Sequence, residues 1–215
     1  MSLPGWLRAV LPGDTASTWE TIRGTLPASS YLVGGTAIAI HLRHRVSRDL
    51  GFFLAQPEDL AALRSELEGL GHFAASMHSQ DTLNGVFNGT KVQFLSATDQ
   101  QVLEPLTAIE GIRLAALGDL LATKLKVIGD RGELRDYYDT KVIEERAGRR
   151  AEEGIALFVR RYRPRDPETA VRHLLLGLGY FDDVGEDPFL PETRDQIVGY
   201  WRRRQPGIIR ALRRS

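Results

Sequence analysis

The chain of 215 residues contains no cysteine, which excludes disulfide bonds, thiol catalysis and cysteine metal sites. It has no apolar run long enough to span a membrane, and its amino terminus lacks the basic-then-apolar order of a signal peptide. A Gly-x-Ser-x-Gly elbow and a Walker lysine loop are also missing. The contents of 42% apolar and 26% charged residues are ordinary. We therefore expect a soluble cytoplasmic protein that makes no contact with a membrane.

Metal-ligating side chains are few. The five histidines include His41 and His44, which stand three residues apart instead of the four that suit a zinc pair on a helix. Neither a cysteine nor a nearby acid completes such a site, so the sequence does not favour zinc.

The formal net charge is zero, with 28 basic and 28 acidic residues, but the charges are unevenly distributed along the chain. The segment 141–215 holds 16 basic and 12 acidic residues, and arginines cluster at 160–165 and 202–204. Two interpretations stay open. Such clusters can hold a polyphosphate backbone, or they can be the solvated faces of helices interleaved with acids.

One stretch has the pattern of a strand, a glycine turn, a helix and a second strand. Residues 31–33 suit a buried strand, Gly34 and Gly35 break it, and an apolar helical run follows over 37–42. Glycines let a backbone approach a phosphate closely, and the first N–H groups of a helix point at an anion. The pattern indicates a phosphate site, although a glycine pair before a helix is also typical of a plain tight turn.

An acid stands at the head of the second strand. Asp49 precedes the apolar residues 50–54, and its carboxylate could hold the magnesium that accompanies nucleotide phosphates. Between the helix and this strand, His44, Arg45 and Arg48 form a cationic patch.

This stretch resembles the nucleotidyltransferase toxins of the AbiEii/MenT family, whose signature reads Gly-Gly-Thr/Ser, a short helix, His-Arg-x-Ser-x-Asp-x-Asp and then aromatic residues. The matching positions are Gly34, Gly35, Thr36, His44, Arg45, Ser47, Asp49, Phe52 and Phe53. The chain departs from the signature at Gly51, where the family usually has the second aspartate. The candidate position for a third acid holds a neutral amide, Gln93.

A second block lies at 119–139. Lys124 interrupts an apolar helical face, so its ammonium must reach water, pair with an acid or meet a ligand. Asp136 and Asp139 stand three residues apart, hence on one face of a helix, with Arg135 beside them. These residues could bind a triphosphate and position a hydroxyl, or form a buried salt bridge that holds two helices together.

The second block also resembles the family, whose later motif it matches at Asp119, Lys124, Leu125, Arg131, Arg135, Asp136 and Asp139. By this resemblance Gly34, Gly35 and Thr36 hold the nucleotide phosphates, with Ser47 adjoining, and Asp49 is the catalytic acid that binds Mg²⁺. Lys124 contacts the triphosphate, assisted by Arg131 and Arg135. Asp139 orients or deprotonates the attacking group, with Asp136 beside it. In some members an antitoxin kinase phosphorylates a serine at the position of Ser47, which in this chain can equally be a turn residue.

Gly51 bears on the activity that we expect. Two-metal transfer normally uses at least two carboxylates, and Asp49 alone makes a weak magnesium site. Three accounts stay open: a one-carboxylate enzyme of low rate, a non-catalytic relative that still binds nucleotide, or a chain in which an aspartate has been replaced.

Strand patterns come first and helical patterns later, which predicts an α+β chain in two lobes. We expect a small mixed sheet in residues 1–117 and a helical bundle in 118–215, the plan of the nucleotidyltransferase fold. In the first lobe we expect a helix behind a capping box at 17–20, a hairpin turn at Asn88-Gly89 and a strand at 111–117. In the second we expect Asp119 to cap a helix and a last helix to span 191–204.

The resemblance implies a toxin of a toxin–antitoxin pair. Such a protein would transfer nucleotides from an NTP, with magnesium, to the acceptor end of a tRNA and so halt translation. Its partners would be NTP, tRNA and a cognate antitoxin. Two alternatives stay open. The chain could be a non-catalytic relative that binds nucleotide, RNA or antitoxin, or a nucleotidyltransferase that acts on a small molecule.

Overall fold

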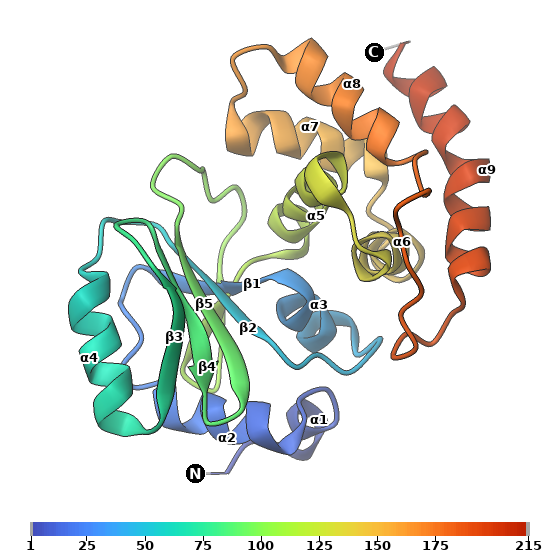
Figure 1. The fold of residues 1–215 in the computed structure, drawn as a ribbon. Coiled ribbons are helices and arrows are strands. Elements are labelled where there is room, and N and C mark those ends of the chain that lie inside the picture. The colour runs from blue at the N-terminus through green and yellow to red at the C-terminus, as the bar shows by residue number, and fades with distance from the viewer. Residues whose placement is uncertain (1, 214–215) are drawn as a thin grey trace. The chain divides into compact units, whose positions relative to one another are not determined.

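The computed structural model describes residues 2–213, which form two compact units. One unit holds the chain up to Gln100 together with Pro105–Ala116, and the other holds Gln101–Glu104 and the chain from Leu117 onward. All strands belong to the first unit, and the five long helices of the carboxyl-terminal half belong to the second (Figure 1).

The first unit is built on a seven-stranded mixed sheet with the order β3-β4-β5-β2-β1-β7-β6. Strand β1 runs antiparallel to β2 and parallel to β7, while β2 runs parallel to β5. The strands are β1 (Ser30–Val33), β2 (Leu50–Leu54), β3 (Phe73–His78), β4 (Thr82–Phe87), β5 (Thr90–Ser96), β6 (Thr107–Ile109) and β7 (Ile112–Leu114).

The two faces of β2 and β5 differ, because successive side chains on a strand point to opposite sides. Leu50, Phe52, Val92 and Phe94 are fully buried on one face. The rings of Phe52 and Phe94 stack 5.2 Å apart at paired positions, which fixes the register of these two strands. The intervening residues on the other face are half-buried, and Gly51 is one of them.

Four helices complete this unit: α1 (Gly5–Arg8), α2 (Gly13–Ile22), α3 (Gly34–Leu42) and α4 (Leu60–Leu70). The expected capping box at 17–20 is wrong. Helix α2 begins at Gly13, directly after Pro12, so those four residues lie inside it. Trp19 and Ile22 are buried as their helical spacing predicts.

Two positive-φ turns join neighbouring strands of the sheet. Asn88 and Gly89 both have positive φ in the turn between β4 and β5, which confirms the predicted hairpin. The strand expected at 111–117 is present as β7 but is shorter, because α5 already begins at Leu117. Glu110 and Gly111 make a second positive-φ turn, which joins β7 to β6, a strand that the sequence did not predict.

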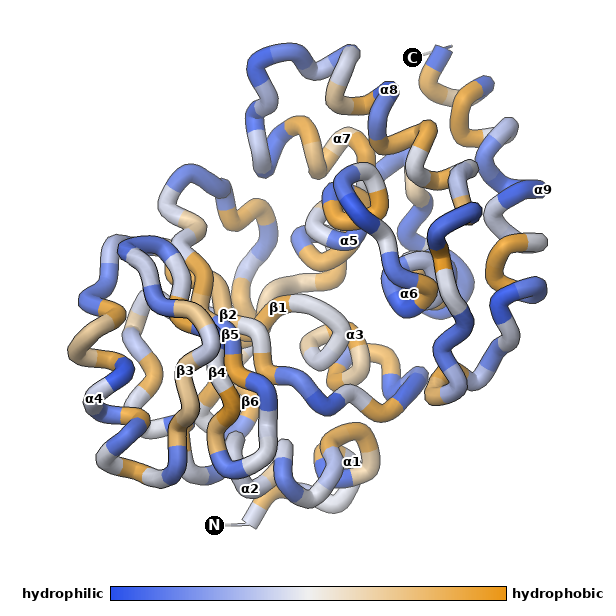
Figure 2. Tube along the Cα trace, in the orientation of Figure 1, coloured by the Kyte–Doolittle hydropathy of each residue, from blue (hydrophilic) through white to orange (hydrophobic). Residues whose placement is uncertain are grey.

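The second unit is a helical bundle of α5 (Leu117–Arg131), α6 (Leu134–Ala147), α7 (Ala151–Tyr162), α8 (Pro167–Gly177) and α9 (Arg194–Leu212). Trp201 of α9 is fully buried, and its Nε1 donates to the carbonyl oxygen of Tyr137 at 3.0 Å. Helix α9 alternates between hydrophilic and hydrophobic residues along its length (Figure 2).

Two expectations about these helices need correction. Asp119 is not the cap of α5, because the helix begins two residues earlier at Leu117. The last helix begins at Arg194 and continues through Pro206 to Leu212, well past the predicted end at residue 204. A proline interrupts one helical hydrogen bond, but burial of Ile208 beyond it anchors the last turns. Within residues 2–213, no helix combines the length and apolar character needed to cross a membrane.

Candidate nucleotide site

The turn from β1 into α3 forms the amino end of a helix directly after a buried strand. Gly34 has φ +72°, a left-handed conformation that a side chain makes costly. No side chain of the described residues caps the helix that follows. The first N–H groups of a helix lack intrahelical partners and carry partial positive charge, so this turn suits an anionic group.

Thr36, in the first turn of α3, connects the helix to the other predicted residues of this unit. Its hydroxyl lies 2.7 Å from the hydroxyl of Ser47 and also donates to the carbonyl oxygen of Asp49. Thr36 and Ser47 are only 2% and 6% exposed. The structure therefore brings Gly34, Thr36, Ser47 and Asp49 together, although they are spread over sixteen positions. A kinase could reach the buried Ser47 hydroxyl only after this loop opened.

The loop between α3 and β2 is also held from the amino-terminal segment, to which the sequence patterns gave no role. The N–H of Ser47 donates to Val10, and the Thr15 hydroxyl donates to the carbonyl oxygen of Arg48. The guanidinium of Arg43 lies 5.0 Å from the centre of the Trp6 ring. These contacts depend on long-range packing, so no local motif would have revealed them.

The two histidines considered for zinc serve the fold. His41 forms a hydrogen bond through Nε2 with the carbonyl oxygen of Ala115 at 2.9 Å, and His44 is buried. Within residues 2–213 no group of three or more histidines and acids could hold a metal ion.

A row of polar positions crosses the half-buried face of the sheet beside Asp49. Gly51 pairs with Gln93 on β5, and Gln93 pairs with Asn84 on β4. Asp49 lies directly before the first residue of β2, two positions from Gly51. Together with Asp49, the row offers one carboxylate, a glycine and two amides. This donor set fits one magnesium ion shared with substrate phosphates, and it does not fit a two-ion site.

The backbone conformation at position 51 does not require a glycine. Its φ is not positive, and a Cβ atom built on it meets no other atom within 4 Å. The Oδ1 atom of Asn84, in the same row, is buried without a hydrogen-bond partner among the described residues. A larger polar side chain at position 51 would thus have room.

Lys124 is at the centre of a second cluster, within the helical unit. Its Nζ lies 2.7 Å from Oδ1 of Asp136 and 2.8 Å from Oδ2 of Asp139. Lys124 is 6% exposed and Asp139 is 0% exposed. The other oxygen of Asp136 accepts the N–H of Glu133 and so caps α6. The salt bridge between helices that the sequence allowed is present, and it joins α5 to α6.

The two predicted arginines lie outside this cluster. Arg135 is half-exposed and pairs with Glu133 at 2.5 Å. Arg131 is exposed at the carboxyl end of α5, where it lines two cavities of about 680 and 350 Å³. Asp183 lines both cavities as well, whereas Asp136 and Asp139, the carboxylates bound to Lys124, line neither.

Asp119 has a structural role that its motif does not reveal. Its carboxylate accepts the N–H groups of Leu103 and Glu104 and pairs with Arg161. Arg161 is 0% exposed. The pair ties the segment Gln101–Glu104 to α5 and α7, and it withdraws one arginine of the 160–165 cluster from the surface.

Arg204, in the other arginine cluster, is likewise committed to the fold. It pairs with Glu144 at 2.9 Å and with Glu152. Partial burial alone would raise the pKa of the Glu152 carboxyl, but the hydrogen bond and positive charge of Arg204 hold that pKa below its usual value. The remaining members of the two clusters are exposed, namely Arg160, Arg163, Arg165, Arg202 and Arg203. Each cluster therefore mixes structural arginines with exposed ones.

Comparisons with known proteins agree with this architecture. The sequence profile of a family described as nucleotidyl transferase AbiEii toxin, type IV toxin–antitoxin system, matches residues 22–212. The chain is 29% identical over 174 residues to the protein aq_aa25 of Aquifex aeolicus, covering 80% of each chain.

Solved structures resemble it as well. JHP933 of Helicobacter pylori superposes with a TM-score of 0.58 at 15% identity, covering 99% of this chain and 96% of that one. MenT4, a nucleotidyltransferase toxin of Mycobacterium tuberculosis, gives 0.50 at 14% identity, covering 91% of this chain and 80% of that one. These likenesses confirm the expected α+β nucleotidyltransferase-like fold.

Proposed function

Because the chain belongs to the AbiEii family of nucleotidyltransferase toxins, we propose that it transfers nucleotides from an NTP to the acceptor end of a tRNA and so blocks translation. One observation carries the proposal: among the described residues no side chain caps the helix start at Gly34, and Thr36 links this helix to Asp49. That arrangement offers an anion site and a carboxylate on adjacent segments of one compact unit. A cognate antitoxin is the partner that such a family implies.

The residues of the sheet unit bind and orient the nucleotide. The backbone N–H groups of Gly34, Gly35 and Thr36 donate hydrogen bonds to phosphate oxygens. Asp49 would hold a single Mg²⁺, which neutralises phosphate charge when bound. Ser47 keeps the loop in place through its contact with Thr36.

The residues of the helical unit act around Lys124, which we assign to the triphosphate, with the exposed Arg131 and the half-exposed Arg135 as further cations. The ion pairs of Lys124 favour a positioning role for Asp136 and Asp139 over direct contact with the attacking group. A fully buried Asp139 reaches substrate only through the ammonium that it holds.

In the proposed reaction, the terminal hydroxyl oxygen of the acceptor forms a bond to the α-phosphorus of the NTP. The bond from that phosphorus to the oxygen that bridges to the β-phosphate breaks. Pyrophosphate leaves with the bonding electrons, and the hydroxyl proton passes to solvent. Positioning and electrostatic stabilisation supply most of the rate in phosphoryl chemistry of this kind.

The test incubates the protein with each of four α-labelled NTPs and total tRNA. We expect labelled tRNA from the parent protein and none above background from Asp49→Asn, which keeps the size of the side chain and removes its charge. Because Asp49 is half-buried and not part of the core, the variant should melt within a degree or two of the parent. Labelling that persists in the variant contradicts the proposal.

A second function is favoured by the row beside Asp49. With Gly51 and Gln93 in place of acids, the chain could bind NTP without reacting. The same preparation separates the two functions: NTP binding by equilibrium dialysis without any labelled tRNA supports the non-catalytic binder.

A further inference from the structure

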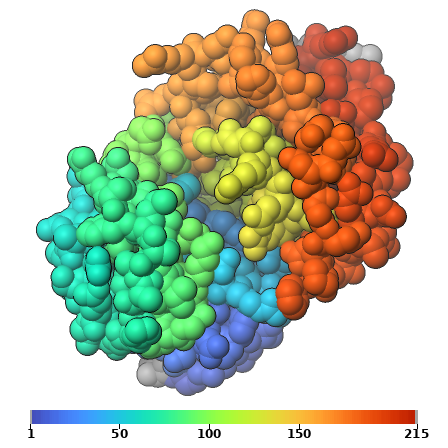
Figure 3. All heavy atoms as spheres, viewed as in Figure 1, coloured from blue at the N-terminus to red at the C-terminus, as the bar shows by residue number. Residues whose placement is uncertain are grey.

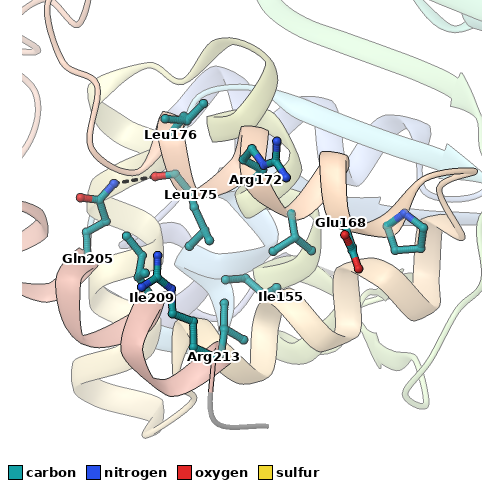
Figure 4. Close-up of a pocket in the computed structure, with 11 residues that line it drawn as sticks. Ile155, Glu168, Arg172, Leu175, Leu176, Gln205, Ile209 and Arg213 are labelled. Carbon is teal, nitrogen blue, oxygen red and sulfur yellow. Dashed lines mark hydrogen bonds between the residues drawn. The ribbon is translucent and has the colours of Figure 1, made fainter.

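A groove of about 640 Å³ runs between three helices of the helical unit, and no role above uses it. Helix α7 contributes Ile155, α8 contributes Val171 and Leu175, and α9 contributes Ile209 and Leu212. Figure 4 shows Leu175, Ile209 and Ile155, one from each of the three helices, lining the groove. In the space-filling view, α8 and the carboxyl-terminal end of α9 lie side by side (Figure 3). An open apolar groove of this size is a recognised mark of a binding site.

The spacing of the lining residues gives the groove a direction. Glu168, Arg172 and Leu175 follow one another by four and three positions on α8, and Gln205, Ile209 and Leu212 do so on α9. Each wall is thus one face of a helix, about 10 Å long at 1.5 Å per residue. A groove walled lengthways by two helices has the shape into which a third helix of two to three turns packs.

The walls are held in place before any partner arrives. Gln205 of α9 donates from Nε2 to the carbonyl oxygen of Leu175 on α8 at 2.6 Å, and Figure 4 shows this bond at one end of the groove. The bond satisfies both polar groups and fixes the distance between the walls. Binding to a preformed groove has a low reorganisation cost.

The charges at the groove indicate which helix fits. Arg172 and Arg213 line it against a single acid, Glu168. Neither arginine forms an ion pair with a described residue, although the charge of Arg172 contributes to lowering the pKa of Asp166. The lining is therefore apolar at its floor and positive by one charge at its rim. A partner needs apolar side chains at helical spacing and acids on either side of them.

We infer that this groove binds an acidic amphipathic helix of a protein partner, which lays its apolar face on Leu175 and Ile209 and its carboxylates on Arg172 and Arg213. The site lies wholly within the helical unit. The inference does not depend on nucleotide transfer, so Asp49→Asn should bind the helix as the parent does.

The test uses synthetic fluorescein-labelled helices of eighteen residues, measured by fluorescence anisotropy with the full-length protein. One helix has leucines at spacings of three and four and glutamates elsewhere. Its twin has lysines in place of the glutamates, and a third is a scramble of the acidic helix. We expect the acidic helix to bind at least tenfold more tightly than the other two.

Two charge-reversed proteins locate the binding. In Arg172→Glu/Arg213→Glu, the acidic helix should bind at least tenfold more weakly and the lysine helix more tightly. The matched control, Arg202→Glu/Arg203→Glu, changes the same charge at exposed positions of α9 outside the groove lining and should alter binding less than threefold. Ile209→Glu should abolish binding, and its melting curve shows whether the fold is kept.

Several results would overturn the inference. Equal binding of the acidic helix and its scramble would do so, as would equal losses in the groove variants and in the control. Dodecanoate that binds where no helix does would make the groove a site for small amphiphiles. A dimer in light scattering that Ile209→Glu converts to monomer, with no helix binding, would make it a contact between copies.

Discussion

The turn at the amino end of α3 and the cluster around Lys124 both match motifs of the family, but they are physically unlike. The first consists of backbone groups and small side chains, next to a strand position with open space at Gly51. The second consists of three charged side chains buried together, each already satisfied by another. The turn at α3 thus has the properties of a ligand-binding surface, and the cluster around Lys124 has those of a structural salt bridge between two helices.

The difference shows that a motif residue to which we assign a substrate can also be required by the fold. A lysine that lies between two carboxylates is desolvated, and its removal leaves like charges in a medium that cannot screen them. A glycine at a helix start can be replaced with little loss of packing, but the strain alters the groups that face the ligand. The following variants test this contrast between a ligand-binding turn and a structural charge cluster.

Removing the ammonium of the cluster should have the largest effect. We expect Lys124→Met to lower the free energy of unfolding by about 3–5 kcal/mol, because two buried carboxylates lose their counter-ion. Urea denaturation measures this change. The triple variant Lys124→Met/Asp136→Asn/Asp139→Asn removes all three charges and should recover most of the loss. If Lys124→Met were as stable as the parent, the ammonium would be held for a ligand and not for the fold.

Restoring an acid beside the first site should have the next largest effect. Gly51→Asp should raise nucleotide transfer about a hundredfold, which corresponds to roughly 2.7 kcal/mol of barrier, because a second carboxylate joins Asp49. Steady-state labelling of tRNA measures it. Gly51→Asn is the control of equal size without charge and should leave the rate near that of the parent. Equal rates in both variants would mean that this face does not take part in metal binding.

A smaller effect is expected at the helix start. Gly34→Ala should lower the free energy of unfolding by about 1–2 kcal/mol, since its φ of +72° disfavours any side chain. Gly24→Ala serves as the control, because Gly24 also has open space around it but no positive φ, and it should change stability little. Thermal melts of both variants separate strain from packing, and a harmless Gly34→Ala would contradict the strained turn.

The smallest effect concerns Glu152, which provides a partly exposed ion pair for comparison with the buried one. Its pKa in the folded protein is held below its ordinary value of 4.5, so its carboxylate stabilises the fold above that pH and loses this contribution as the pH falls. Glu152→Gln should cost up to about 1 kcal/mol at pH 7.5. In urea denaturation at pH 3.5, the difference in unfolding free energy between the variant and the parent should be smaller. A difference that grows in acid would contradict a stabilising Glu152 carboxylate.

Local chemistry predicted much of the fold. The hairpin at Asn88-Gly89 needs only two residues that tolerate positive φ, and both have it. The predictions failed where a distant partner decides the outcome. A capping box at 17–20 satisfies local rules, yet the chain enters the helix earlier, after Pro12. Asp119 suits a cap, but it serves the N–H groups of residues 103 and 104.

The sequence by itself determined which residues belong to the two motifs, because motif spacing is a property of the chain. Only the tertiary structure decided what those residues face. It placed Gln93 beside Gly51 and joined Lys124 to two aspartates. Strand register and the closure of helix pairs are set by the packing of residues far apart in the chain, and no local pattern carries that information.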